Sequence, residues 1–484
     1  MINRLQNDTL QLSRDEMIAL GHEVVAMIVA HLEGLPNKPV VRKADRPSLE
    51  SCLREPLPEQ SVPISTVIRQ VQRDVLSNVS HNDHPRYFAF VSGPGNFVSA
   101  MADALASGFN VIPADWLDAS GPSEVELVTV DWLRQICGLP EGAGGLFVSG
   151  GSMANLICLS TARHAKLREK NTSSAVAYCS DQTHSSVERA LRVLGFDISQ
   201  LQKLPSDDSF RISSAQLRQR IADDRAAGRI PFCVIANAGA TNTGAVDPLV
   251  EVGQLCRQEG LWLHVDGAYG APAVLCEKGR SLLRGLELAD SLALDPHKWL
   301  FQPYEIGCVL VRDVRSLHKA FAVRPDYLKD LESKEAEVNF CDYGIQLSRS
   351  FRALKLWMSL KVFGLAAFRE AVARGFFLAE FAESLLQPSS HWEVVTPASM
   401  GIITFRFVPD GVPEQDTDLI NQQIVDETLK EGFATVSSTR LRGRKVLRLC
   451  TINPRTTEDD IRQTLQRLEH FGRLACASSS LRGQ

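Results

Sequence analysis

The pattern of hydrophobic and polar positions changes twice along the 484-residue chain. Up to about residue 80, apolar residues at helical spacing precede a proline-bearing connector over residues 35–63. The apolar residues of this helical pattern are Met17, Leu20, Val24, Met27 and Ile28. A helical pattern followed by such a connector indicates an arm and not a core, so we expect residues 1–83 to form a helical arm.

From residue 84 to 363, short β-branched segments alternate with helical segments. Alternation of this kind is typical of an α/β domain with a mostly parallel central sheet flanked by helices. The candidate strands are residues 146–149, 175–179, 232–236, 261–265 and 291–294.

From residue 364 to 484, a long amphipathic helix precedes two further candidate strands at 401–408 and 446–451. This part of the chain therefore predicts a smaller C-terminal α+β domain.

Composition narrows the range of partners. The chain is 44% hydrophobic and 23% charged with a formal net charge of -5, which is typical of a soluble enzyme and gives no electrostatic reason for a nucleic-acid or membrane partner. The apolar run at residues 23–32 is too short to span a bilayer, and no cleavable signal pattern precedes it. The eleven cysteines occur singly, without metal or disulfide spacing. These features predict a cytoplasmic protein.

The residues that follow each candidate strand carry the chemistry, because ligands bind at the carboxyl ends of parallel strands. Gly150, Gly151 and Ser152 follow the strand at 146–149 and precede a helical pattern. Glycines let backbone amides approach an anion, and a helix N-terminus favours negative charge. The same turn occurs in many α/β proteins without a phosphate, so this signal alone leaves both interpretations open.

Asp266 follows the strand at 261–265 in an apolar setting, where a carboxylate must be paired or hydrogen-bonded. A helix N-cap is the alternative interpretation of such an aspartate. The small residues Gly267 and Ala268 come next, and they leave room for a flat ligand above them. They favour a binding role for Asp266 and place Ala268 against that ligand.

Lys298 follows the strand at 291–294, within Asp295–Trp299 (DPHKW). We expect burial to lower the pKa of this lysine and make it nucleophilic towards carbonyls, although most lysines are simply exposed. A phosphate cradle, an acid able to pair with a pyridinium, and an imine-forming lysine on three strands of one sheet together predict a pyridoxal phosphate site.

Four further residues are candidates. His184 lies between a strand and a helical pattern and could lie flat on an aromatic cofactor, or it could be a capping or solvated histidine. Thr241, in the turn at residues 238–244, could face the same ring. Phe90 and Trp116 could line a pocket for a flat substrate side chain, or they could belong to the core.

These motifs resemble the group II pyridoxal-phosphate decarboxylases, which include the aromatic-L-amino-acid, histidine, glutamate and tyrosine decarboxylases. The resemblance runs from His84–Phe90 (HPRYFAF) through His264–Asp266 and Asp295–Leu300 to Ser350–Lys355 (SFRALK). It implies a fold-type I transferase-like enzyme with pyridoxal 5'-phosphate as cofactor. It also implies an obligate homodimer with active sites at the subunit interface and an N-terminal arm wrapped over the partner.

The resemblance also assigns roles. Lys298 corresponds to the Schiff-base lysine, Asp266 to the partner of the pyridinium nitrogen, and His184 to the residue stacked on the ring. Tyr327 matches a mobile-loop tyrosine that protonates the substrate after carbon dioxide leaves. The residues that resemble the phosphate-binding group and its neighbours are Gly151, Ser152, His297, Thr241 and Asp295.

The resemblance implies decarboxylation of an L-amino acid, with an aromatic substrate favoured. Two departures leave a glutamate- or diaminobutyrate-like substrate open: residues 91–93 (VSG) stand where the aromatic branch commonly has Phe-Pro, and Gly344 stands where it commonly has arginine. An oxidative aldehyde synthase of the same family is a further alternative, against which Tyr327 argues. Lys298 and Asp266 argue against a non-catalytic relative.

Overall fold

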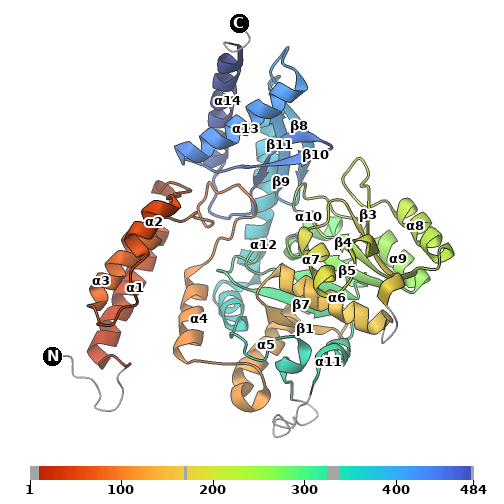
Figure 1. The fold of residues 1–484 in the computed structure, drawn as a ribbon, viewed down its shortest axis with the longest axis horizontal. Helices are drawn as coiled ribbons and strands as arrows, with labels where there is room; N and C mark the ends of the chain where they lie inside the picture. Colours follow the sequence, from red (N-terminus) through yellow and green to blue (C-terminus); the bar gives the residue numbers. More distant parts are fainter. Residues whose placement is uncertain (1–9, 168–171, 324–336, 481–484) are drawn as a thin grey trace.

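The computed structural model describes residues 10–167, 172–323 and 337–480. Figure 1 shows a large body built around one sheet, a smaller sheet at one end, and a helical arm that stands apart from both.

The central sheet has seven strands in the order β1-β7-β6-β5-β4-β2-β3. Its strands are β1 (Gly144–Val148), β2 (Ala175–Ser180), β3 (Leu201–Leu204), β4 (Ile230–Asn237), β5 (Trp262–Asp266), β6 (Ser291–Leu294) and β7 (Gly307–Val311). β7 pairs antiparallel with both of its neighbours, β1 and β6, and the other described pairings in this sheet are parallel. The predicted mostly parallel sheet is therefore confirmed.

Five of these strands match the predicted segments, whereas β3 and β7 were not predicted. β3 is a four-residue strand at the sheet edge, and its single alternation gives little periodic signal. β7 is buried throughout, and a short apolar run of that kind cannot be told from a buried helix by periodicity alone.

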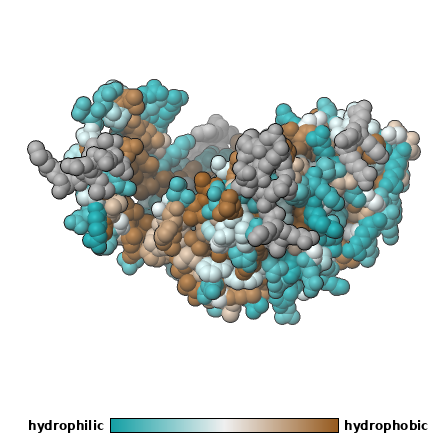
Figure 2. Space-filling view, turned by 90° about the horizontal axis from the view of Figure 1, so that it is seen from below, coloured by the Kyte–Doolittle hydropathy of each residue, from teal (hydrophilic) through white to brown (hydrophobic). Residues whose placement is uncertain are grey.

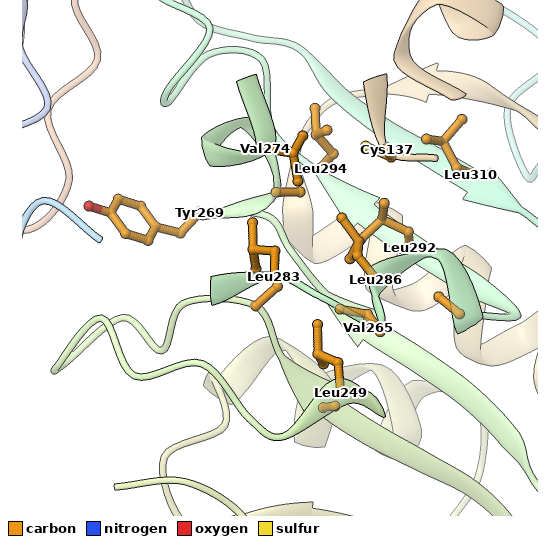
Figure 3. Close-up of a cluster of buried hydrophobic side chains, with 14 of the residues drawn as sticks. Cys137, Leu249, Val265, Tyr269, Val274, Leu283, Leu286, Leu292, Leu294 and Leu310 are labelled. Carbon is orange, nitrogen blue, oxygen red and sulfur yellow. The ribbon is translucent and has the colours of Figure 1, made fainter. Parts of the chain in front are cut away.

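Helices cover both faces of the central sheet. They are α4 (Phe97–Gly108), α5 (Trp116–Ile136), α6 (Gly151–Leu167), α7 (Ser185–Val193), α8 (Ser214–Ala226), α9 (Leu249–Glu259), α10 (Glu277–Leu282) and α11 (Arg315–Phe321). Figure 3 shows part of the resulting core, where Val265 of β5 and Leu292 of β6 pack with Leu249 and Leu283. Strands buried on both faces explain why the sequence reads there as apolar runs.

The smaller domain contains a four-stranded antiparallel sheet in the order β10-β11-β9-β8. Its elements are β8 (Trp392–Ser399), β9 (Ile402–Phe407), α13 (Glu414–Glu431), β10 (Ser437–Leu441), β11 (Arg444–Cys450) and α14 (Glu458–Ser480). β9 and β11 match the two predicted strands, and β8 and β10 add to them. The predicted smaller α+β domain is thus confirmed.

Helix α12 (Ala353–Leu386) joins the two sheets and breaks at Gly364, where φ is 73°. Glycine adopts this left-handed conformation without the steric cost that other residues meet. The break coincides with the boundary at residue 364 inferred from the sequence. The division of the chain at residues 83 and 363 stays a prediction.

The arm consists of α1 (Arg14–Gly34), α2 (Arg46–Leu53) and α3 (Ile64–Gln70), and none of the residues in these helices is buried. It is drawn in red at the left of Figure 1. In Figure 2, hydrophobic side chains gather around the hollow between the arm and the body.

The N-terminal helical stretch is longer than the apolar run at residues 23–32 suggested. Residues 14–37 are long and apolar enough to cross a membrane by length and composition. This is weak evidence for a span, because an apolar helix that docks on another protein surface has the same composition.

Candidate functional site

A cavity of about 310 Å³ opens at the carboxyl ends of the parallel strands. It collects residues from separate segments, as the strand-end rule predicts. The predicted residues that line it are Gly151, Ser152, His184, Thr241, Asp266, Ala268, Asp295, His297 and Lys298. Phe90 and Trp116 are not among its described lining residues, and Tyr327 lies outside the described part of the chain.

The glycine turn between β1 and α6 packs directly against the other walls of the cavity. A Cβ atom at Gly151 would lie 2.8 Å from both the Ala268 Cβ and the Asp295 Oδ2, so a side chain there would force a shift. At Gly150, where φ is +157°, a Cβ would lie 3.2 Å from the His297 Cε1. Helix α6 begins at Gly151, so its N-terminal amides face the same space.

Lys298 points at Asp295, with 2.8 Å between Nζ and Oδ2. The lysine side chain is 23% exposed and the aspartate 2%. Burial alone would lower the pKa of Lys298, but the carboxylates of Asp295 and Asp266 outweigh it and raise that pKa above its usual value. The expectation of a lowered pKa was therefore wrong for this arrangement, because it ignored the neighbouring acids.

Asp266 ends β5 and is held by two donors. Asn155 Nδ2 donates to Asp266 Oδ2 at 3.0 Å, and the Ala268 backbone N–H donates to Oδ1 at 3.2 Å. The alternative N-cap interpretation does not hold, since the next helical segment is a short 3-10 turn that begins at Ala271. The carboxylate is free to meet a ligand in the cavity.

His184 caps a helix, as one interpretation of its position predicted, and its stacking on a cofactor ring stays a prediction. It is the N-cap of α7, where its Nδ1 accepts from the Ser186 backbone N–H at 3.2 Å. It also lines the cavity. Burial is the main cause that lowers the pKa of His184, so the ring is neutral near neutral pH and can lie against an aromatic group.

His297 is buried beside the glycine turn, with its Nδ1 2.7 Å from the Ile306 carbonyl oxygen. The Tyr304 ring lies against it, with 4.7 Å between ring centroids. Burial lowers the pKa of His297 as well. The ring is thus oriented by its own backbone contact before any ligand binds.

Thr241 is connected to Phe90 through the small domain. Arg448 of β11 donates to the backbone carbonyl of Thr241 at 2.9 Å and also to the backbone carbonyl of Phe90. Phe90 itself is 69% exposed, and Trp116 is half-buried at the start of α5. Neither belongs to the core of the chain as the alternative interpretation would require.

The cavity also contains residues that the sequence reasoning missed, among them Asn155, Ser186, Asn237 and Tyr269. Asn237 ends β4 directly after a predicted strand, so the strand-end rule could have found it. Asn155 lies inside α6, and Tyr269 follows the small residues after β5. A polar residue within a helix gives no signal in the sequence that distinguishes it from any other.

The donor set fits a flat aldehyde that carries a phosphate. The glycine turn and the α6 N-terminus suit the anion, Lys298 can form an imine, and Asp266 can pair with a ring nitrogen. Ala268 and the glycines keep the walls low enough for a planar ring.

Comparison with known proteins identifies the family. The model of the pyridoxal-dependent decarboxylase conserved domain matches residues 48–408, more than half of the chain. The chain belongs to the pyridoxal-dependent decarboxylases. It is therefore a pyridoxal-phosphate-dependent carboxy-lyase, and the cofactor inferred from the sequence is confirmed.

Several relatives of this decarboxylase are characterised. It is 50% identical over 465 residues to the aromatic-L-amino-acid decarboxylase of Bacillus atrophaeus, which covers 96% of this chain and 97% of the relative. It is 30% identical to the phenylacetaldehyde synthase of Arabidopsis thaliana, over 93% of this chain and 94% of that protein. The crystal structure of Oryza sativa TDC with PLP and tryptamine superimposes with a TM-score of 0.92 at 28% identity, covering 96% and 99%. The predicted fold-type I architecture is confirmed.

Proposed function

We propose that this protein decarboxylates an aromatic L-amino acid to the corresponding amine and carbon dioxide. The observation that carries the proposal is the convergence of Lys298, Asp266 and the glycine turn at Gly151 on one cavity. The 50% identity to a relative named aromatic-L-amino-acid decarboxylase supports an aromatic side chain on the substrate.

Lys298 is the residue to which pyridoxal phosphate attaches in this proposal. When bound, the cofactor supplies a ring that withdraws electrons from the substrate's α-carbon. Asp295, 2.8 Å from the amine, holds Lys298 in place and can accept its proton during attachment. Lys298 thereby becomes both the anchor of the cofactor and a base within reach of the substrate.

Asp266 keeps a proton on the ring nitrogen, because a carboxylate beside a pyridinium stabilises the charged form. His184 would contact the bound ring, and the small side chain of Ala268 would leave room for it. Gly151 and Ser152, at the start of α6, bind the phosphate together with His297. Thr241 and Asp295 complete the surroundings of the cofactor.

The substrate's side chain is assigned to the rim of the site. Phe90 offers an exposed ring, and Arg448 links its backbone to the Thr241 turn that lines the cavity. Trp116 is a second aromatic candidate near the start of α5. Tyr327 is proposed as the proton donor to the α-carbon once carbon dioxide has left.

A homodimer accounts for the arm. An exposed apolar helix is costly in water, and a second copy of the chain would cover it. A groove of about 1200 Å³ along the arm is lined mainly by apolar atoms, including Val24, Met27, Ile68 and Val71. Burial in a dimer makes a membrane span unnecessary, and we assign the protein to the cytoplasm.

One assay tests the proposed reaction. The purified protein with pyridoxal phosphate is offered the twenty common amino acids, dihydroxyphenylalanine and diaminobutyrate separately, and released carbon dioxide and amine are measured. We expect equal amounts of both products from an aromatic amino acid. Release from glutamate or diaminobutyrate alone would replace the aromatic assignment, and transamination without gas would overturn decarboxylation.

The relative named phenylacetaldehyde synthase makes a second outcome worth measuring. Ammonia and hydrogen peroxide in place of amine would assign this protein to the oxidative aldehyde synthases. The Tyr327→Phe variant sharpens the distinction, since loss of the proton donor should shift products from amine towards aldehyde.

A further inference from the structure

A line of buried hydrogen bonds runs from the interior of the sheet to the carboxylate of Asp266. Trp262 Nε1 donates to Ser291 Oγ at 2.8 Å, and that oxygen lies 2.9 Å from His264 Nδ1. His264 Nε2 lies 2.9 Å from Asn155 Oδ1, and Asn155 Nδ2 donates to Asp266 Oδ2 at 3.0 Å. Trp262, Ser291 and His264 are not among the described residues that line the cavity.

The two ends of this line fix the direction of every bond in it. The indole N–H of Trp262 can only donate, and the ionised carboxylate of Asp266 can only accept. Asn155 must therefore turn its NH₂ towards Asp266 and its oxygen towards His264, which places a proton on His264 Nε2. His264 Nδ1 then accepts from the Ser291 hydroxyl, whose oxygen accepts from Trp262. Every donor in the line points towards the carboxylate.

Asn155 also reaches a second cavity residue. Its other amide hydrogen is donated to Ser186 Oγ at 2.9 Å, and Ser186 Oγ lies 2.8 Å from His184 Nδ1. Because Ser186 Oγ already accepts from Asn155, its own hydrogen goes to His184 Nδ1. The proton of His184 is then on Nε2, so one amide group fixes both the carboxylate of Asp266 and the tautomer of His184.

The burial of this line implies that it is more than incidental packing. His264 is 0% exposed, and Asn155 and Ser291 are each 1% exposed. Burial lowers the pKa of His264 to about 4, so the ring is neutral and can serve as donor on one side and acceptor on the other. Polar groups at such depth are costly unless each one has a partner, and an apolar core would have been simpler to build.

We propose that Asn155 is a positioning residue for the cofactor ring, and that Trp262, Ser291 and His264 set the orientation of its amide. The proposal rests on the functions proposed above for Asp266 and His184. Asn155 acts before substrate arrives: it holds the carboxylate of Asp266 in the orientation that meets the ring nitrogen, and it keeps His184 in the tautomer that presents Nε2–H.

Removing a hydrogen bond at the end of this line that lies far from the cavity should change the orientation of the Asn155 amide in the cavity. In Ser291→Ala, His264 Nδ1 loses its donor, and the ring is free to carry its proton on Nδ1 instead. Nε2 would then accept, and Asn155 would gain by turning its NH₂ towards His264. That rotation would place the Asn155 oxygen against the carboxylate of Asp266, which is repulsive.

The test is the dissociation constant of pyridoxal phosphate, measured without substrate by titrating the apoprotein and following visible absorbance. For Asn155→Leu we expect affinity on the order of 10- to 100-fold weaker, since a hydrogen bond to a buried charged group is lost. For Ser291→Ala we expect the affinity to be about tenfold weaker than that of the unmodified protein. In Ser291→Thr, which keeps the hydroxyl, the affinity should stay within about twofold of that of the unmodified protein. The pH at which the bound cofactor's spectrum changes should also shift, most in Asn155→Leu, less in Ser291→Ala and least in Ser291→Thr.

Thr161→Val is the matched control, because it removes a buried hydroxyl from the same helix, α6. That hydroxyl donates to the Ile157 carbonyl and is not connected to Asp266. Its affinity should stay within about twofold of the unmodified protein. Apoprotein melting temperatures separate folding from positioning. Equal affinities in Asn155→Leu and the control would overturn the proposal, as would a Ser291→Ala variant that binds normally.

The Asp266→Asn variant in the same titration keeps the two proposals distinguishable. If it binds and titrates like the unmodified protein, the role proposed for Asp266 fails. If it is impaired while Asn155→Leu and Ser291→Ala are not, only the positioning role of Asn155 fails.

Discussion

The cavity and the N-terminal arm differ in how far the same chain buries their side chains. In the cavity, Asp266 and Asp295 are almost fully buried and their partners come from the same chain. In the arm, α1 carries exposed apolar residues such as Met17 and Val24, and nothing in α1 is buried. The polar groups of the cavity are packed against residues of the same chain. The arm, in contrast, has apolar side chains that nothing in the described part of this chain covers.

This difference predicts which substitutions act within one chain and which act between chains. The described polar groups of the cavity are oriented by partners from the same chain, so under the proposed function cofactor affinity should depend mainly on substitutions near the cavity. The arm helices have no buried residues in this chain, so in the proposed dimer their substitutions should act through assembly.

Replacing the proposed anchor should have the largest effect. Lys298→Ala should lower the decarboxylation rate by at least about 10⁴-fold, because no other described amine lines the cavity to attach the cofactor. The visible absorbance of the bound cofactor should disappear as well. Lys203→Ala removes a partly exposed lysine paired with Glu188 and should leave both readings unchanged. Residual activity within tenfold would contradict the assignment.

The strand-end carboxylate comes next. Asp266→Asn should reduce the rate by about 10²- to 10³-fold, because a neutral amide cannot stabilise a protonated ring nitrogen. The phosphate cradle at Gly151 is untouched, so some cofactor should remain bound at saturating concentration. The measurement is the rate at full cofactor occupancy. A rate equal to that of the unmodified protein would show that the ring nitrogen is not protonated through this residue.

The arm should respond through subunit association. The double variant Val24→Glu, Val29→Glu should weaken the dimer by about 100-fold or more, since two charges would be buried without partners. Sedimentation at decreasing protein concentration measures the constant. Leu419→Glu, on the exposed face of α13, is the control and should not change it. A dimer that tolerates the arm charges would show that the arm's apolar face lies outside the interface.

The smallest effect concerns two buried histidines, His84 and His264. Burial lowers the pKa of His84, near the base of the arm, and that of His264, behind the cavity, to about 4 from an ordinary value of 6.5. Between these pH values the unfolded chain binds more protons than the folded one, so stability falls as the pH falls. Each histidine should lower the free energy of unfolding by up to about 2 kcal/mol from pH 7 to pH 5.

Denaturant titrations at the two pH values measure this loss. His84→Asn should remove about half of the loss in unfolding free energy that His84 and His264 together cause. His470→Asn, at an exposed position of α14, is the control and should not change that loss. An identical loss in His84→Asn and the unmodified protein would mean that other groups govern the acid sensitivity.

The sequence was informative wherever local chemistry and periodicity agree. Apolar runs bounded by glycine and aspartate predicted the strands β1, β5 and β6, and the residues after them proved to share one cavity. Asp266 and Lys298 were recognisable because an acid or an amine at the end of a buried strand is rare without a ligand or partner.

Other features depended on tertiary contacts. The pKa of Lys298 is raised rather than lowered, since Asp295 folds back to 2.8 Å from its amine, a distance that no spacing in the sequence specifies. Asn155 gave no signal, because its role depends on three partners that the fold brings to it from α7 and β5, namely Ser186, His264 and Asp266. The exposed position of Phe90, outside the cavity lining, was equally invisible.

The amino-acid sequence by itself determined the kind of chemistry, because reactive residue types at strand ends can be read from hydrophobic periodicity and from a few turn residues. Only the tertiary structure decided which of those groups face one another, which direction their hydrogen bonds take, and which apolar surface stays uncovered. These properties arise from distances between segments far apart in the chain, and local sequence patterns do not encode such distances.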